Sequence, residues 1–467
     1  MSETLDFVIG GMPRGGTTAT GNIFNVHPDS YCYAAETHWL PILMEFAEFG
    51  PVPKAAFPQV ERIAMHQNRQ VLFEMARFAV SRGANPRSLI FEESDLGPLT
   101  KAMVGLMRQG LHGRELCQAA LPILRGHIVE RTGKQVVGEK TPNNVFAFDA
   151  YGALGTKAAF MIMREPFAVV RSMHNRGKDS KDIYASVFRS NLVSLIGIWN
   201  SYVEAILDAR RHESSVLLTY EKMVKQPMEV LEQVYKRVGL RTDEEILKSA
   251  SGLLKEISRG PPWADMPPAE QALIWHLTKP IRERAGYGDD FYDQHGFDRS
   301  TLGSDLDGSE EQVMPVFGAH NMSTGETLQW LMKRGCLAIQ SAPGRRSVTL
   351  KLWSNFPPEL LQQNQKAKIA FSTYGVDKKY LASAEARGGR PETVGVTINL
   401  ADIEPAIASP NGEIRLVAFD ASHAYRSYLT AVSQKFLRFG LISAVRRVLL
   451  GGDRRQMSFA LTGVEFG

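Results

Sequence analysis

Residues 5–27, LDFVIGGMPRGGTTATGNIFNVH, decide the fold of this chain. They begin with an apolar run at residues 5–9, which predicts a short buried strand. A glycine-rich turn at residues 10–16 follows, and Thr17 and Thr18 open a predicted helix. This arrangement binds phosphate, because the loop amides point inward and the positive end of the helix attracts an anion. The stretch therefore predicts an anion site at the first strand of an α/β sheet.

The spacing of the loop resembles a Walker A motif, G-x-x-x-x-G-K-[ST], with Gly11 and Gly16 as its glycines. Thr17 stands where that motif has its lysine, and Arg14 supplies a cation inside the loop. A P-loop nucleoside triphosphatase needs this lysine to contact the β- and γ-phosphates of its substrate. The loop therefore favours a shorter anionic ligand, and a plain glycine-rich turn is the alternative that this motif leaves open.

The bulk composition describes an ordinary globular protein. The chain has 467 residues, 44% of them hydrophobic and 22% charged, and this length predicts two domains. A net charge of +4 is too small for a general nucleic-acid surface. The three cysteines, Cys32, Cys117 and Cys336, have no disulfide or metal-ligand spacing, which predicts a reducing, cytoplasmic compartment. We expect no signal peptide and no transmembrane helix, because no apolar run approaches about 18 residues.

Strands and helices alternate in the first part of the chain. Further strands are predicted at residues 136–138, 158–163 and 216–219. Residues 20–135 are predicted to be helical with loops, above all 46–79 and 99–131, and a helix is predicted to follow Tyr220 and Glu221 and to run through Val238. Each predicted strand ends in a polar cluster. The pattern predicts a P-loop-like, doubly wound parallel sheet whose ligand lies beyond the carboxyl ends of the strands.

The pattern of apolar and polar residues changes after a segment rich in Gly, Asp and Ser. Period-two alternation predicts strands at residues 347–353, 368–372, 394–400, 413–419 and 457–466. Short alternating strands without intervening helices predict a C-terminal β-sandwich. The predicted organisation is an α/β domain at residues 1–295, a linker at 296–325 and the β-sandwich at 326–467.

Four motifs of the first domain together resemble the PAPS-dependent sulfotransferases, which move a sulfonate from 3′-phosphoadenylyl sulfate (PAPS) to an acceptor. The motifs are GMPRGGTT at residues 11–18, GEKTP at 138–142, REPFAVVRSM at 164–173 and LTYEKMV at 218–224. They occur in the family's order, and the likeness is strongest to bacterial members and to the tyrosylprotein sulfotransferases. One departure is Gly15, which stands where the family's loop usually has serine.

The resemblance implies a role for individual residues in binding PAPS. The 5′-phosphate and the sulfonate would be bound by Arg14, Gly15, Gly16, Thr17 and Thr18. Lys140 would complete the clamp on the transferred group, unless it is a solvated surface lysine. Arg164 and Ser172 would bind the 3′-phosphate, unless the arginine instead pairs with Glu165 or Glu139 and the serine only lies on a helix face. Arg171 is expected to be a solvated helix charge. Tyr220 would reach the adenine or else be a core tyrosine.

Two further segments resemble functional parts of the family. Arg259 begins RGPPW at residues 259–263, which is similar to a segment that covers the 3′-phosphate, although a lysine is missing and two prolines intrude. The acceptor hydroxyl needs a general base, and in YAAETHW at residues 33–39 the resemblance implies Glu36. His38 is the second candidate, since its ordinary pKa suits the role. Glu36 could instead cap a helix or pair with Arg14. The family needs no metal for transfer, and we expect none.

The C-terminal end resembles a β-sandwich module of bacterial glycosyltransferases. The likeness rests on RFGL at residues 438–441 and GDRRQMSFAL at 452–461, with an arginine-rich helix predicted at 436–450. It implies a carbohydrate setting, and a packing or homo-oligomer domain without a ligand is the alternative.

The sequence therefore predicts a sulfotransferase that uses PAPS, releases 3′,5′-ADP and sulfonates a hydroxyl, with a sugar of a polysaccharide or glycolipid as the expected acceptor. A P-loop kinase of a small molecule and a non-catalytic carbohydrate-binding protein are the rival hypotheses. The missing Walker lysine argues against the kinase, and the four motifs together argue against the binding protein.

Overall fold

The computed structural model describes residues 4–33, 36, 57–58, 61, 65, 93–148, 155–178, 188, 192–254, 261–302, 311–321, 329–354, 365–374, 378–388, 391–409, 412–422, 425–426, 456–457 and 459–467. They group into two compact units. The first unit holds the described parts of Met1–Arg164 and Tyr202–Ser258. The second unit holds those of Glu165–Ser201, Arg259–Thr430 and Asp453–Gly467.

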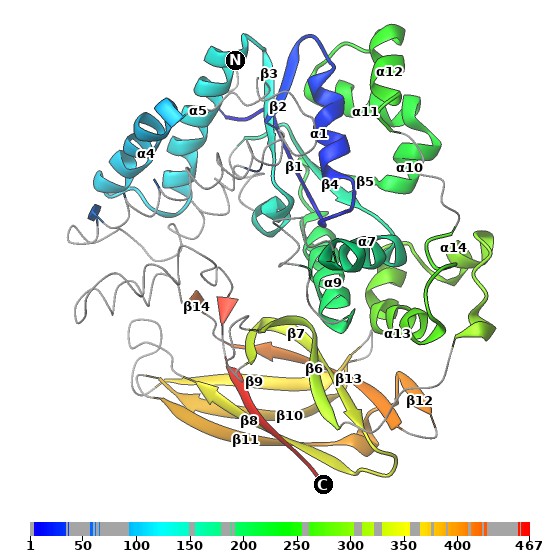
Figure 1. Cartoon of the computed structure of the whole chain (residues 1–467). Coiled ribbons are helices and arrows are strands. Elements are labelled where there is room, and N and C mark those ends of the chain that lie inside the picture. Colours follow the sequence, from blue (N-terminus) through cyan, green and yellow to red (C-terminus); the bar gives the residue numbers. More distant parts are fainter. Residues whose placement is uncertain are drawn as a thin grey trace. The chain divides into compact units, whose positions relative to one another are not determined.

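A five-stranded parallel sheet organises the first unit (Figure 1). Its strands are β1 (Phe7–Gly11), β2 (Ser30–Tyr33), β3 (Val136–Lys140), β4 (Ala158–Met163) and β5 (Ser215–Thr219). They lie in the order β2-β3-β1-β4-β5. All residues of β1 and β4 are buried, as expected for central parallel strands covered on both faces. The predicted doubly wound parallel sheet is confirmed.

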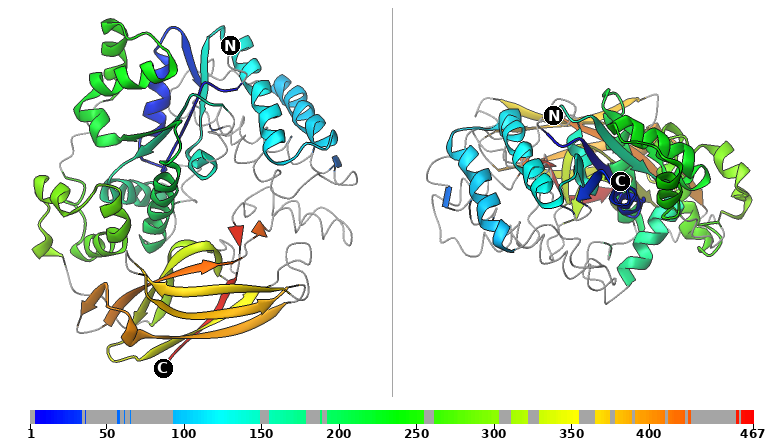
Figure 2. Two further views of the ribbon diagram at one scale, coloured as in Figure 1. Left: turned by 180° about the vertical axis from the view of Figure 1, so that it is seen from behind. Right: turned by 90° about the horizontal axis from the view of Figure 1, so that it is seen from above.

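Helices cover this sheet and lie at both of its ends. They are α1 (Thr17–Asn25), α4 (Glu93–Arg108), α5 (Gly113–Thr132), α10 (Tyr220–Lys225), α11 (Pro227–Val238), α12 (Glu244–Ser251) and the 3₁₀ helix η3 (Pro142–Ala147). α5 lies against β2 and β3, whereas α10 lies against β5, at the other end of the sheet (Figure 2). The core on one face centres on Phe7, Phe24 and Phe160, and the first two rings stack with their centroids 3.9 Å apart.

Two sequence predictions in this unit need correction. β2 lies inside the range 20–135, which was predicted to hold only helices and loops. Its four residues, SYCY, are too few to show a period, and their pairing with β3 decides the conformation. The helix predicted to run from Tyr220 to Val238 is two helices, because Pro227 begins α11 and cannot continue α10. Most of the helical range 46–79 lies outside the described residues.

The second unit contains α7 (Pro166–Lys178), α13 (Pro268–Arg284), α14 (Asp289–Gln294) and the 3₁₀ helix η4 (Arg299–Thr301), and α9 (Leu192–Ala209) belongs in part to each unit. The buried carboxylate of Glu165 caps α7 by accepting from the backbone N–H of Phe167 at 2.9 Å. Arg171, predicted to be a solvated helix charge, is half-buried instead and donates to the carboxylate of Asp265 at 2.7 Å and the carbonyl of Pro262 at 2.8 Å. This contact ties α7 to the segment before α13.

An antiparallel β-sheet forms the rest of the second unit. The strands are β6 (Gln312–Asn321), β7 (Gln329–Ser341), β8 (Ser347–Ser354), β9 (Lys366–Thr373), β10 (Tyr380–Arg387), β11 (Glu392–Asn399), β12 (Ile407–Ser409), β13 (Gly412–Ala421) and β16 (Ala460–Phe466). The 3₁₀ helix η5 (Leu400–Asp402) follows β11, and β14 (Tyr425–Arg426) pairs with β15 (Gln456–Met457). The main order is β10-β9-β13-β7-β16-β8-β11, and the two end strands lie against each other.

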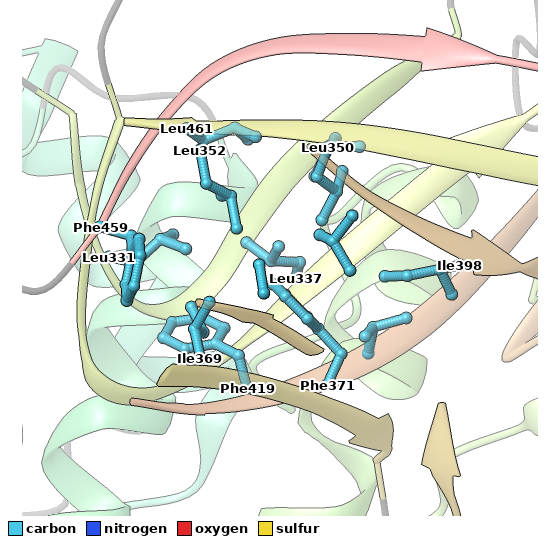
Figure 3. Close-up of a cluster of buried hydrophobic side chains, with 14 of the residues drawn as sticks. Leu331, Leu337, Leu350, Leu352, Ile369, Phe371, Ile398, Phe419, Phe459 and Leu461 are labelled. Carbon is cyan, nitrogen blue, oxygen red and sulfur yellow. The ribbon is translucent and has the colours of Figure 1, made fainter. Parts of the chain in front are cut away.

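This sheet encloses one apolar core. Leu331, Leu350, Phe371, Ile398 and Phe419 are fully or almost fully buried in it (Figure 3). The alternating burial of β8 is the period-two pattern seen in the sequence. Of the predicted C-terminal β-sandwich, the β-domain is confirmed: β6 to β13 and β16 are joined in one hydrogen-bonded sheet, and β14 and β15 form a separate pair.

Part of the β-structure was not predicted. β6 lies within the range 296–325 predicted as a linker, because it pairs along β7. β7, β10 and β12 were also missed, and the arginine-rich helix predicted at 436–450 lies outside the described residues. The domain boundaries at 295 and 326 stay a prediction.

Candidate active site

The loop after β1 places its backbone close to two neighbouring strand ends. Gly11 has a φ of +154°, and a Cβ built on it would stand 2.4 Å from the carbonyl oxygen of Ile162 in β4. Gly16 has a φ of +108°, and a Cβ there would stand 2.6 Å from Cδ2 of Tyr220. Both positions therefore require glycine. Between them, Arg14 is exposed and has a φ of +67°, the left-handed conformation that costs an ordinary residue energy.

The N-terminus of α1 is the part of this loop that has the geometry to bind an anion. Gly16 precedes the helix and has no side chain with which to cap its first N–H groups, and the first turn contains no acidic residue. The side chain of Thr20 donates back to the carbonyl oxygen of Gly16 at 3.1 Å, which fixes the first turn. Thr17 is buried and Thr18 is exposed. Amides and the positive helix end thus lie beside the exposed Arg14.

Arg164 and Tyr220 join the loop at the ends of β4 and β5. The guanidinium carbon of Arg164 lies 4.4 Å from the centre of the Tyr220 ring, a cation–π contact. The same ring lies against Gly16. The structure thus brings together Gly16, Arg164 and Tyr220, three residues for which the sequence predicted donor-binding roles.

Lys140 and Glu36 form an ion pair at the end of β3. Nζ of Lys140 lies 3.0 Å from Oε1 of Glu36. The lysine side chain is only 3% exposed, whereas the carboxylate is 39% exposed. The alternative of a solvated surface lysine is therefore wrong. In the register of the sheet Lys140 is opposite Ile9, one residue before the glycine-rich turn, so the pair lies next to the loop.

A network that the sequence did not predict ties the end of β3 to β1. The buried carboxylate of Glu139 accepts from the Thr141 hydroxyl at 2.8 Å and from the side-chain amide of Asn144. The same amide also donates to the carbonyl oxygen of Ile9 at 3.1 Å. Because these buried polar groups have hydrogen-bond partners, the network fastens the end of β3, which carries Lys140, to β1. The spacing of these residues in the sequence does not predict the hydrogen bonds of this network.

Tyr202 is a second residue that sequence reasoning missed. Its hydroxyl donates to Oδ1 of Asn143, and burial, with a smaller contribution from the negative charge of Glu36, raises the pKa of Tyr202 well above its usual value. Tyr202 comes from α9, far away in sequence, so no local pattern could have revealed its contact with Asn143.

The remaining predicted residues are placed as follows. Gly15 is buried, and its N–H donates to the carbonyl oxygen of Met12 at 3.0 Å, closing the turn. Ser172 is half-buried on α7 in the second unit. His38 and Arg259 lie outside the described residues. Within the part of the chain that the structure describes, no cluster of three or more His, Cys, Asp or Glu side chains is arranged to hold a metal, and no helix is long and apolar enough to span a membrane.

The arrangement has the parts of a group-transfer site for an anionic substrate. Backbone amides and Arg14 are available to bind an anion at the loop, Arg164 is a second cation, and Lys140 is a third. The partly exposed carboxylate of Glu36 is the group that can accept a proton.

Comparison with known proteins agrees with this description. The model of the sulfotransferase family matches residues 6–244, which include β1 to β5 and end before the C-terminal sheet. No curated protein matches the chain. The sulfotransferase domain from the curacin biosynthetic pathway is 17% identical, with a TM-score of 0.32 over 53% of this chain and 77% of that domain.

Two further solved structures are similar. The sulfotransferase domain from the Synechococcus PCC 7002 olefin synthase is 15% identical, with a TM-score of 0.33 over 64% of this chain and 85% of that one. Retinol dehydratase in complex with androsterone and the inactive cofactor PAP is 13% identical, with a TM-score of 0.25 over 55% of this chain and 65% of that one.

Proposed function

Because this chain belongs to the sulfotransferase family, we propose that the enzyme takes the sulfonate from PAPS and transfers it to a hydroxyl of a sugar, in a polysaccharide or glycolipid. PAPS, when bound, supplies the sulfonate and a 5′-phosphate leaving group. The ion pair between Glu36 and Lys140, 3.0 Å apart beside the loop, is the observation that carries the proposal. It joins a base for the acceptor to a cation for the transferred group.

The residues of the loop fit the donor. The close approach that only glycine permits at positions 11 and 16 lets backbone amides surround a phosphate. Arg14 faces outward beside them, and Arg164 is oriented by the ring of Tyr220. We assign the 5′-phosphosulfate to the loop and Arg14, and the 3′-phosphate to Arg164 with Ser172 and Arg259. We assign the adenine to Tyr220.

Transfer needs positioning and charge stabilisation rather than a covalent enzyme intermediate. Glu36 takes the proton of the acceptor hydroxyl while that oxygen forms its bond to sulfur. Arg14 and Lys140 stabilise the negative charge that the 5′-phosphate gains when its bond to sulfur breaks, which leaves 3′,5′-ADP as product. His38 is the second candidate for the base.

Lys140 has a double role in this proposal. Without donor its ammonium neutralises Glu36. A bound anion at the loop competes for the same ammonium, since both are negative and Lys140 is otherwise buried. Donor binding thereby weakens the pair and leaves the carboxylate to the acceptor, so the base becomes available only when there is a sulfonate to transfer.

Two wider assignments complete the proposal. Cys32, Cys117 and Cys336 are free and buried, which supports a cytoplasmic enzyme. For the C-terminal sheet we propose that it presents the glycan acceptor or joins two copies of the chain.

Isothermal calorimetry tests the donor assignment, with 3′,5′-ADP and with ATP–Mg²⁺ as the two ligands. We expect 3′,5′-ADP to bind without metal and Lys140→Ala to reduce turnover with PAPS. Lys157→Ala is the matched control, because Lys157 pairs with Asp6 at 2.8 Å beside the amino ends of the strands. Binding of ATP–Mg²⁺ with none of 3′,5′-ADP would favour the kinase hypothesis and refute ours.

A further inference from the structure

An exposed aromatic ring belongs to η3, the short helix that follows the strand carrying Lys140, the ion-pair partner of the predicted base. Phe146 is 49% exposed, although it belongs to η3, directly after the strand end that carries Lys140. Phenylalanine is among the side chains most often fully buried, whereas this ring keeps about half of its surface exposed after the strand end that carries Lys140.

The ring is held in place by Tyr202. The centroids of the Phe146 and Tyr202 rings are 4.8 Å apart, with the planes at 64°. The Tyr202 hydroxyl donates to Asn143, which lies three residues before Phe146. Side chains at this spacing share one face of a 3₁₀ helix. Tyr202 therefore contacts two residues of the same face, Asn143 through its hydroxyl and Phe146 through its ring. Phe146 is thus a supported ring with part of its surface open.

The same tyrosine connects this ring to the strand end whose lysine contacts Glu36. Tyr202 is buried within range of the Glu36 charge, and Lys140, only three residues before Asn143, contacts that carboxylate at 3.0 Å. Any hydroxyl that gives its proton to Glu36 must come within hydrogen-bond distance of it. The body of the acceptor attached to that hydroxyl therefore lies near the end of β3, which η3 and its partly open Phe146 ring follow directly.

We propose that Phe146, braced by Tyr202 and Asn143, is the platform on which a sugar ring of the acceptor packs, and that it selects acceptors whose reacting hydroxyl is attached to such a ring. This inference rests on the proposed function and adds the acceptor-binding residues to it. A pyranose has one face of C–H groups, and these carry slight positive charge. The face of a phenylalanine ring is slightly negative, so the two surfaces attract and both lose contact with water.

Saturation-transfer NMR with methyl β-D-glucopyranoside, in the presence of saturating 3′,5′-ADP, tests the platform. In this sugar H1, H3 and H5 share one face. We expect these three protons to receive more saturation than H2 and H4, and Phe146→Ala to remove the difference and raise the dissociation constant about tenfold. Phe146→Trp keeps an aromatic face and should retain it. Leu253→Ala is the matched control, because Leu253 is 44% exposed but follows α12, a helix that packs on α11 and α1.

The affinity for 3′,5′-ADP, measured on the same variants, separates the two proposals. If the wild-type chain fails to bind 3′,5′-ADP, the proposed donor is wrong. If 3′,5′-ADP binds equally to wild type and Phe146→Ala while the sugar shows no saturation transfer to wild type, or an unchanged dissociation constant in Phe146→Ala, the platform is overturned and the donor assignment stands.

Discussion

Replacing Gly16 by alanine should damage the phosphate loop in two separable ways. The φ of +108° is one that an L-residue adopts at a cost of roughly 1–2 kcal/mol. The new Cβ would also stand 2.6 Å from Cδ2 of Tyr220, and overpacking of this kind costs roughly 1–3 kcal/mol. Together the two terms lower the free energy of unfolding of this unit by about 2–5 kcal/mol.

Hydrogen exchange of amides in the sheet measures this loss of free energy of unfolding. Amides of β1 and β4 are buried, and they exchange when the sheet opens. A loss of about 2–5 kcal/mol, at about 1.4 kcal/mol for each factor of ten, speeds their exchange by roughly 30- to 4,000-fold. Gly239→Ala is the control: its φ is +79°, but nothing lies within 4 Å of the built Cβ, so only the backbone term applies.

A double-mutant cycle separates the clash from the backbone cost. Tyr220→Ala alone loses the cation–π contact with Arg164, about 0.5–1 kcal/mol. In the double variant Gly16→Ala/Tyr220→Ala the clash is gone, so the two changes should cost about 1–3 kcal/mol less than the sum of the single changes. Additive effects would refute the inference that the loop is packed against the Tyr220 ring.

Three further predictions concern the site and the thiols. Arg164→Ala should weaken 3′,5′-ADP binding by about 2–4 kcal/mol, because it leaves a phosphate without its charged partner, and calorimetry checks this; unchanged affinity would remove Arg164 from the 3′-phosphate site. Glu36→Gln should abolish turnover of PAPS in a sulfonate-transfer assay while 3′,5′-ADP affinity stays nearly intact, and retained activity would move the base to another residue. Burial raises the pKa of the Cys117 thiol to about 12 and that of the Cys32 and Cys336 thiols further. Above about pH 8.5 the thiols ionise in the unfolded chain but stay protonated in the folded one, because their pKa is raised there. The free energy of unfolding should therefore fall as the pH rises above this value, by about 1.4 kcal/mol per pH unit for each thiol.

The control for the thiol prediction is Cys117→Ala. This variant should show a shallower fall of the free energy of unfolding between about pH 9 and pH 12 than the wild-type chain, because one ionising group is missing from its unfolded state. Urea unfolding at a series of pH values measures the slope, and an identical slope in the two proteins would show that Cys117 does not contribute.

The parallel sheet was predicted well because its strands carry their own local pattern. β4 coincides with the predicted range 158–163, since six successive apolar residues suit a strand buried on both faces. β2 was missed, because its short sequence owes its conformation to pairing with β3. The same reason applies to β6 and β10, whose conformation depends on strands remote in the sequence.

The sequence by itself determined the glycine-rich loop, the cations at the strand ends and the family, because glycine, arginine and the strand period act over a few residues. Only the tertiary structure decided that Lys140 is buried against Glu36, that the Tyr220 ring fills the space beside Gly16, and that Tyr202 braces Phe146. Each of these contacts joins residues between 56 and 204 positions apart in the chain. Such pairs are fixed by the order of the strands and by packing, which no local spacing encodes.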